Sequence, residues 1–287
     1  MVTYQHNYVS LPTLRLHYLD YGGTGEVVVA LHGYIQNAHF FDGIASALVP
    51  HVRLIALDLR GRGKSEWGPP ADYHLRQYVE DLGYFLDRLQ LSRFALMGTS
   101  LGGLVAFIYA VFHPFEVTRL VLNDVAMNSN LDEAVLVARR YSRAPSRFPR
   151  ISDALAWFKD ERPDLDSLDY ERRVAWVSQF LCPETTGGFR FNCDPALLSL
   201  SALPRPTPRP IVQQIIMQRA AQLRIPVLLL RGATSTVTTP ADAREMVQML
   251  SDAESVDVPG IGHAPTLYEP VAQSALCRFF GITPAMD

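Results

Sequence analysis

The chain has 287 residues, a length that suits one large α/β domain with an insertion, or two small domains. Apolar residues make up 48% and charged residues 19%, which is ordinary for a folded protein and excludes a disordered chain. The formal net charge of −3, with no run of Lys or Arg, argues against nucleic acid as the main partner.

Local composition excludes further classes. The first residues lack a basic segment followed by an apolar core, so we expect no signal peptide, and the longest apolar stretch, Leu104 to Phe112, is too short to span a bilayer. The three cysteines, Cys182, Cys193 and Cys277, favour free thiols in a reducing compartment, although a Cys182–Cys193 bridge stays open. No Cys/His spacing resembles a metal site. We therefore expect a cytoplasmic protein with no membrane partner.

Apolar runs and helical periodicity alternate over the first 125 residues. An opening hairpin is predicted over 8–20. Continuous apolar runs that predict buried parallel strands cover 27–31, 52–57, 94–97 and 117–125. Helical segments are predicted over 39–48, 75–89 and 104–110. This alternation predicts a parallel sheet with helices on both faces.

The pattern changes between Ala126 and Pro210, where we predict no strands. Helices are predicted near 131–143, 152–160 and 170–181, before a connector that contains Pro195, Pro204, Pro206, Pro208 and Pro210. The sheet pattern then resumes, with helices at 212–223, 241–250 and 270–280 and strands at 226–232 and 253–258. Because it resumes, we interpret residues 126–210 as a helical cap insertion over the sheet edge, and residues 1–125 and 211–287 as the core. The alternative is a second independent domain.

The motif Gly98-Thr99-Ser100-Leu101-Gly102 lies between a predicted strand and a predicted helix. In that context G-x-S-x-G is typical of a nucleophile elbow, a sharp turn that lifts the serine hydroxyl clear of the sheet. Leu101 starts the helix, so its N–H lacks an intrahelical partner and points to where negative charge develops in acyl transfer. The alternative is a glycine-rich turn that binds phosphate or nothing.

Polar residues follow four predicted strands at their carboxyl ends: His32, Asp58, Ser100 and Asp124. Ligands of open α/β sheets bind at this edge. We therefore expect these four side chains at one edge of the sheet.

Four motifs in this order resemble the capped, single-domain α/β-hydrolases. They are His32-Gly33, Asp58-x-x-Gly61-x-Gly63-x-Ser65, Gly98-x-Ser100-x-Gly102-Gly103 and Gly262-His263. The resemblance covers the whole chain except the predicted cap. It implies an α/β-hydrolase fold, with a mostly parallel central sheet, helices on both faces and a helical cap insertion. It implies no cofactor and no metal.

The resemblance also assigns roles to residues. Ser100 is the expected nucleophile, and His263, in a glycine-flanked loop after the last strand, is the general base that takes its proton. The expected oxyanion hole consists of two backbone N–H groups, those of Tyr34 and Leu101. His32 and the motif that begins at Asp58 are expected to be structural.

The third triad member departs from the family pattern. Most relatives carry the acid in the segment that corresponds to 233–237, where Thr236 stands in place of Asp. Some carry it after the strand that precedes the cap, and here that strand ends at Asp124. We therefore predict a Ser100–Asp124–His263 triad. The alternatives are that Asp124 only caps the turn into the cap, that Asp242 reaches in, that a Ser–His dyad works with reduced activity, or that the usual acid site is merely vacated at 236.

A serine at the elbow excludes the relatives that cleave carbon–halogen bonds or epoxides, because these need a carboxylate there. The resemblance favours a serine hydrolase that cleaves a carboxylic ester, lactone or thioester through an acyl-serine intermediate. The alternatives are hydrolysis of a C–C bond in a diketone-like substrate, acyl transfer to an alcohol, and a ligand-binding receptor with little turnover.

Aromatic residues of the predicted cap are Trp157, Phe158, Trp176, Phe180, Phe189 and Phe191. They can wall a pocket for a small hydrophobic ester-like substrate, or they can form the core between cap and sheet. We expect a monomer or homodimer.

Overall fold

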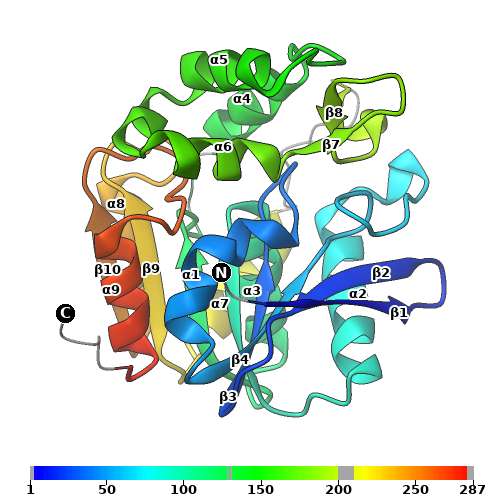
Figure 1. Cartoon of the computed structure of the whole chain (residues 1–287). Helices are drawn as coiled ribbons and strands as arrows, with labels where there is room; N and C mark the ends of the chain where they lie inside the picture. Colours follow the sequence, from blue (N-terminus) through cyan, green and yellow to red (C-terminus); the bar gives the residue numbers. More distant parts are fainter. Residues whose placement is uncertain (1–2, 128, 130, 200–209, 283–287) are drawn as a thin grey trace.

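The computed structural model describes residues 3–127, 129, 131–199 and 210–282. Within this part of the chain, eight strands form one sheet in the order β1-β2-β4-β3-β5-β6-β9-β10 (Figure 1). Their bounds are β1 Gln5–Ser10, β2 Arg15–Asp20, β3 Glu26–Leu31, β4 Val52–Leu57, β5 Phe94–Thr99, β6 Val117–Asn123, β9 Val227–Gly232 and β10 Ala253–Val258. The hairpin β1–β2 is antiparallel and joins β4 antiparallel, and every pair from β4 to β10 is parallel.

Helices cover both faces of the sheet. One apolar cluster packs the sheet against α2 (Leu75–Arg88), α3 (Leu101–Phe112), α7 (Pro210–Ala220) and α8 (Pro240–Met249). The other packs it against the 3-10 helix η1 (Ala38–Phe41), α1 (Asp42–Leu48) and α9 (Pro270–Phe279). Within β3, Val29 and Leu31 belong to the first cluster and Val28 and Ala30 to the second, as the two-residue period of a strand requires. The predicted sheet with helices on both faces is confirmed.

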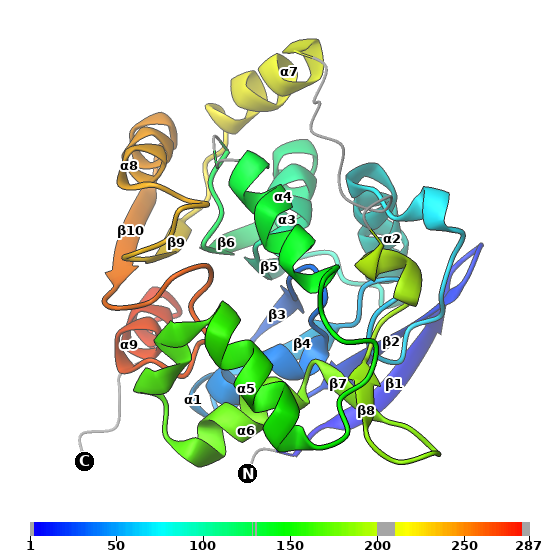
Figure 2. The same ribbon diagram turned by 90° about the horizontal axis from the view of Figure 1, so that it is seen from above.

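Between β6 and β9 the chain leaves the sheet. We call residues 126–199 the inserted segment. It contains α4 (Leu131–Tyr141), α5 (Ile151–Glu161), α6 (Tyr170–Ser178), the strands β7 (Leu181–Pro183) and β8 (Phe189–Phe191), and the 3-10 helices η3 (Pro163–Ser167) and η4 (Pro195–Leu198). Figures 1 and 2 show α4, α5 and α6 above the carboxyl ends of the parallel strands. The assignment of residues 126–210 as a cap insertion stays a prediction.

The prediction that 126–210 contains no strands was wrong. β7 and β8 pair antiparallel, from Leu181 with Phe191 to Pro183 with Phe189. Each strand has only three residues, which is too short to give a visible alternation in the sequence. In the predicted connector, Pro195 begins η4 and Pro210 begins α7, and residues 200–209 lie outside the described part of the chain.

The aromatic residues of the inserted segment form its core. Phe158, Trp176 and Phe180 are each 1% exposed and contact one another at ring-centroid distances of 4.6–5.5 Å. Phe191 is 2% exposed, while Trp157 and Phe189 pack against the same cluster from a partly buried position. The structure therefore supports the interpretation of these side chains as core.

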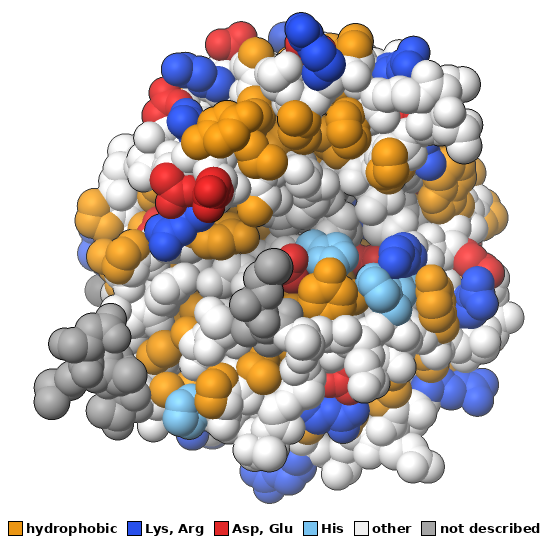
Figure 3. Space-filling model, viewed as in Figure 1, with side chains coloured by type: hydrophobic (Ala, Val, Ile, Leu, Met, Phe, Trp, Pro, Cys, Tyr) orange, Lys and Arg blue, Asp and Glu red, His pale blue; other side chains and the backbone are white. Residues whose placement is uncertain are grey.

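An antiparallel bridge between Arg62 and Cys193 joins the inserted segment to the loop that follows β4. Gly63 N–H donates to Asn192 O at 2.9 Å, and Asp194 N–H donates to Gly61 O at 2.8 Å. On the face shown in Figure 3, hydrophobic side chains gather along the lower rim of the inserted segment, above a hollow in the surface.

All three cysteines are free, as predicted. None of the described helices is both long and apolar enough to cross a membrane.

Close packing at the elbow requires glycine at 102. A Cβ atom at Gly102 would lie 2.2 Å from Leu31 O and 2.5 Å from His32 O, where β3 ends against the first turn of α3. Glycine therefore lets the helix start next to the turn that follows β3.

We expect Gly102→Ala to lower the free energy of unfolding by about 1–3 kcal/mol, because α3 must shift away from β3. Gly83→Ala is the matched control. Gly83 lies inside α2, and a Cβ there would meet only Tyr109 Cε2, at 3.7 Å. That change should raise the free energy of unfolding by up to about 1 kcal/mol through helix propensity. Denaturant unfolding of both variants checks this, and equal effects would contradict the close-packing argument.

Candidate active site

Ser100 lies at the sharp turn between β5 and α3. Its backbone has φ +50° and ψ −113°, a conformation that L-residues rarely adopt and that costs on the order of 1–3 kcal/mol. The Ser100 N–H donates to Asn123 O at 3.0 Å, which fixes the turn against the end of β6. The predicted elbow geometry is therefore present.

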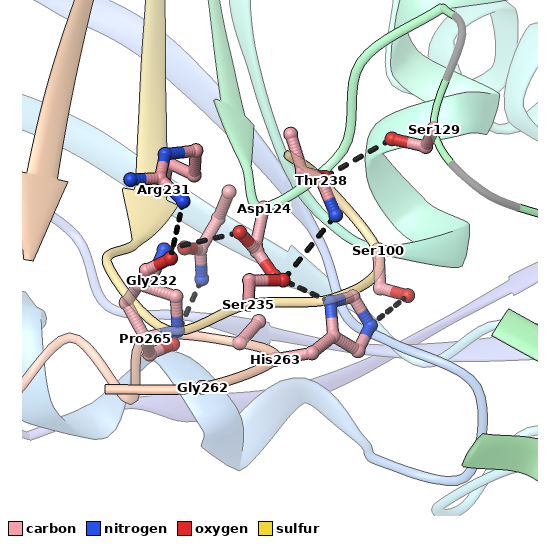
Figure 4. Close-up of polar contacts among 12 residues, drawn as sticks. Ser100, Asp124, Ser129, Arg231, Gly232, Ser235, Thr238, Gly262, His263 and Pro265 are labelled. Carbon is pink, nitrogen blue, oxygen red and sulfur yellow. Dashed lines mark hydrogen bonds and ion pairs between the residues drawn. The ribbon is translucent and has the colours of Figure 1, made fainter. Parts of the chain in front are cut away.

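Three side chains from distant parts of the chain meet beside this turn (Figure 4). Ser100 Oγ lies 2.8 Å from His263 Nε2, and His263 Nδ1 lies 2.6 Å from Asp124 Oδ2. A carboxylate offers only acceptors, so Nδ1 carries the imidazole proton and Nε2 accepts from the serine hydroxyl. The structure brings together the three residues predicted as a triad.

Asp124 is fully buried at the end of β6, with φ +55°. Its Oδ1 accepts from Gly232 N–H at 3.0 Å, at the end of β9. Its Oδ2 accepts from Ser235 Oγ at 2.6 Å as well as from His263. Three donors therefore compensate the burial of this carboxylate.

The two other positions considered for the acid serve elsewhere. Thr236 is exposed, and its hydroxyl donates to Glu133 Oε2 at 3.1 Å. Asp242 closes a capping box at the start of α8, where its carboxylate accepts from Thr239 N–H at 2.7 Å. The geometry favours Asp124 over both positions as the partner of His263.

Ser235 is a site residue that the sequence did not predict. It lies in the loop after β9 where most relatives are expected to carry the acid, and its hydroxyl donates to the Asp124 carboxylate. Its hydroxyl also accepts from Thr238 N–H at 3.3 Å, and Thr238 Oγ1 lies 3.0 Å from Ser129 Oγ. The only available signal was a small hydroxyl residue in a loop without a carboxylate.

The turn after β3 carries the second predicted oxyanion donor. The N–H of Tyr34 belongs to the same peptide unit as the carbonyl of Gly33, and His32 Nδ1 lies 2.8 Å from that oxygen. The other ring nitrogen, His32 Nε2, accepts from Leu59 N–H at 3.0 Å. His32 therefore fixes the orientation of the peptide that presents the Tyr34 N–H, while Leu101 presents its N–H as the first residue of α3.

Asp58 holds loops together beneath this turn. Its carboxylate accepts from Ala38 N–H at 2.6 Å and from Lys64 N–H at 2.8 Å, and it lies 2.7 Å from His17 Nδ1. Burial alone would raise the pKa of Asp58, but the hydrogen bond from His17 holds it below its usual value. In the described residues, no three His, Cys, Asp or Glu side chains are arranged to hold a metal ion.

Comparison with known proteins identifies the family. Residues 26–270 match the family model described as the alpha/beta hydrolase fold. The chain belongs to the α/β-hydrolase family. It is 31% identical to a 3-hydroxybutyrate-oligomer hydrolase of Cupriavidus necator, over 93% of this chain and 92% of the relative.

Other relatives agree with this assignment. The chain is 27% identical to a pimeloyl-[acyl-carrier protein] methyl ester esterase of Pectobacterium atrosepticum, over 90% of this chain and 94% of the relative. Its fold matches the crystal structure of an alpha/beta hydrolase from Novosphingobium aromaticivorans, with a TM-score of 0.88 and 28% identity over 98% of this chain and 99% of that one. The protein is a hydrolase of the α/β fold.

Burial controls the charge of His32 in this hydrolase. The ring is wholly inaccessible, and desolvation lowers its pKa from 6.5 to about 4. His32 is therefore neutral near neutral pH, with Nδ1 as donor to Gly33 O and Nε2 as acceptor from Leu59 N–H. Protonation of Nε2 would break the second of these hydrogen bonds.

The low pKa of His32 predicts a loss of stability in acid. As the pH falls from 6.5 to about 4, the unfolded chain binds a proton at this ring that the folded chain does not, so folding is progressively weakened. The loss attributable to His32 is about 3 kcal/mol. Denaturant unfolding over this pH range should show a smaller pH dependence for His32→Gln than for the wild type. His51→Gln, at an exposed histidine, is the control, and equal slopes for all three proteins would refute the assignment.

Proposed function

We propose that this hydrolase cleaves a carboxylic ester or lactone through an acyl-serine intermediate. The observation that carries the proposal is the continuous chain of hydrogen bonds from Ser100 Oγ through His263 to Asp124. A serine hydroxyl becomes a competent nucleophile only when an imidazole takes its proton during attack. Ser100 and His263 have the contact that this step needs.

Each group has a defined part in the proposed reaction. Ser100 Oγ attacks the carbonyl carbon while His263 Nε2 takes its proton. Asp124 keeps the proton on Nδ1 and stabilises the imidazolium that forms. The N–H groups of Tyr34 and Leu101 receive the developing oxyanion. The imidazolium then protonates the departing alcohol, and a water molecule, deprotonated by the same imidazole, releases the acid from Ser100.

The relatives suggest where to look for the natural substrate. One is named for hydrolysis of 3-hydroxybutyrate oligomers and another for a methyl ester. Both names are consistent with an ester, so we propose short oligomers of hydroxy acids as the first natural substrates to test. The receptor alternative depended on the missing carboxylate at Thr236. It loses that support because Asp124 lies beside His263.

Removal of the nucleophile tests the reaction class. We expect the wild-type chain to turn over nitrophenyl esters of short acids continuously, and Ser100→Ala to lower kcat by at least about 10⁴-fold. Ser142→Ala, which changes a partly exposed serine of the inserted segment, is the matched control and should keep full activity. Steady release of nitrophenol at the same rate from Ser100→Ala would refute the proposal.

Replacement of the acid tests the choice of Asp124. We expect Asp124→Asn to lower kcat by about 10⁴-fold, because an amide donor at this position favours the wrong tautomer of His263. Adding Thr236→Asp should not restore activity, since the side chain at 236 is exposed and directed to Glu133. Asp242→Asn is the control and should leave kcat unchanged. A loss below about tenfold in Asp124→Asn, or rescue by Thr236→Asp, would contradict the assignment.

A further inference from the structure

Both residues that flank His263 are contacted by one ion pair of the inserted segment. Arg162 Nη2 donates to Ala264 O at 3.0 Å, and Gly262 N–H lies 3.4 Å from Asp164 Oδ2. The guanidinium and the carboxylate are joined by two hydrogen bonds of 2.8 and 2.6 Å. The backbone on either side of His263 is thus held by a pair that lies about a hundred residues earlier in the sequence.

The pair is largely buried, and neighbouring groups of the inserted segment contact it. The side chains of Arg162 and Asp164 are 11% and 10% exposed. The guanidinium lies over the ring of Trp176 at 5.4 Å, and Arg162 N–H donates to Phe158 O at 2.7 Å where α5 ends. Desolvation opposes the charge on each group. The hydrogen bonds between them nevertheless raise the pKa of Arg162 and lower that of Asp164, so both stay ionised.

We call residues 259–269, between β10 and α9, the histidine loop. The rest of this loop is held by residues of the core. Thr234 N–H donates to Ile261 O at 2.9 Å, and Asn123 Nδ2 donates to Pro265 O at 2.9 Å. Thr266 N–H donates to Glu269 Oε1 at 2.9 Å. The contacts from the inserted segment therefore fall on the two residues next to His263, between residues that the sheet and α9 hold.

We propose that Arg162 and Asp164 are positioning residues that keep His263 between Ser100 and Asp124. The aromatic core of the inserted segment fixes the pair, and the pair fixes the loop. The hydrogen bonds from Ser100 through His263 to Asp124 then depend on the inserted segment staying in place above the carboxyl ends of the strands. An error of about 1 Å in such a chain is enough to lower a rate by about 10²-fold. The effect on catalysis rests on the proposed function, whereas the effect on the position of His263 does not.

Kinetics provide the first test. We expect Arg162→Gln to lower kcat for nitrophenyl acetate by on the order of 10–10²-fold, with KM little changed, because the variant binds ester but misplaces the base. Arg162→Lys should recover part of kcat, since an ammonium can still donate to Ala264 O. The matched control is Arg173→Gln, which breaks an ion pair with Asp166 elsewhere in the inserted segment. A higher KM with unchanged kcat in Arg162→Gln would overturn the proposal, as would an equal fall in kcat in the control.

Proton NMR provides a readout that does not depend on turnover. The Nδ1 proton of His263, shared with Asp124 at 2.6 Å, should give a strongly deshielded signal that His263→Ala removes. We expect this signal to shift or vanish in Arg162→Gln and to persist in Arg173→Gln and in Ser100→Ala. An unchanged signal in folded Arg162→Gln overturns the proposal.

A second variant covers failure of Arg162→Gln to fold. Asp164→Asn keeps the Arg162 donor to Ala264 O but weakens the contact with Gly262, and it should change both readouts in the same direction by a smaller amount. If it changes neither, the proposal is overturned. If the wild type has no turnover that depends on Ser100 but the NMR signal responds to Arg162→Gln, the proposed function fails while the positioning role stands.

Discussion

The hydrogen bonds to the buried carboxylate of Asp124 are the interactions on which the site depends. A buried charge is tolerated only when its oxygens are satisfied, and here the donors come from the end of β9, the loop after it and the histidine loop. Satisfying one side chain at the end of β6 therefore orders three neighbouring pieces of backbone. The Ser100 turn joins the same arrangement because its N–H donates to Asn123 O.

Most of the framework could be predicted because parallel strands impose it. Apolar runs mark the strands to within a few residues, and parallel strands end at a common edge whatever their order in the sheet. That constraint alone places Asp124 near Ser100. It also explains why a carboxylate other than one at position 236 can contact His263, since β6 lies between β5 and β9.

The unpredicted parts depend on where loop side chains point. Ser235 and Arg162 each donate a hydrogen bond to a group more than a hundred residues away in sequence, and the periodicity of the sequence gives no sign of such contacts. The same holds for β7 and β8, whose three-residue strands leave no pattern. From the sequence, aromatic residues such as Trp176 can either line a pocket or form the core. Only their mutual packing, as at Trp176 and Phe180, decided between the two.

The pairing of β6 with β9 also bears on how the chain is made. Asp124 and Gly232, whose N–H donates to the Asp124 carboxylate, are 108 residues apart, so this contact closes one of the longest loops in the sheet. A nascent chain that has emerged only as far as the inserted segment carries Ser100 and Asp124, but it lacks His263 and Gly232, which both contact the Asp124 carboxylate. The hydrogen bonds that link Ser100 through His263 to Asp124 can therefore form only after β9 and β10 have joined the sheet.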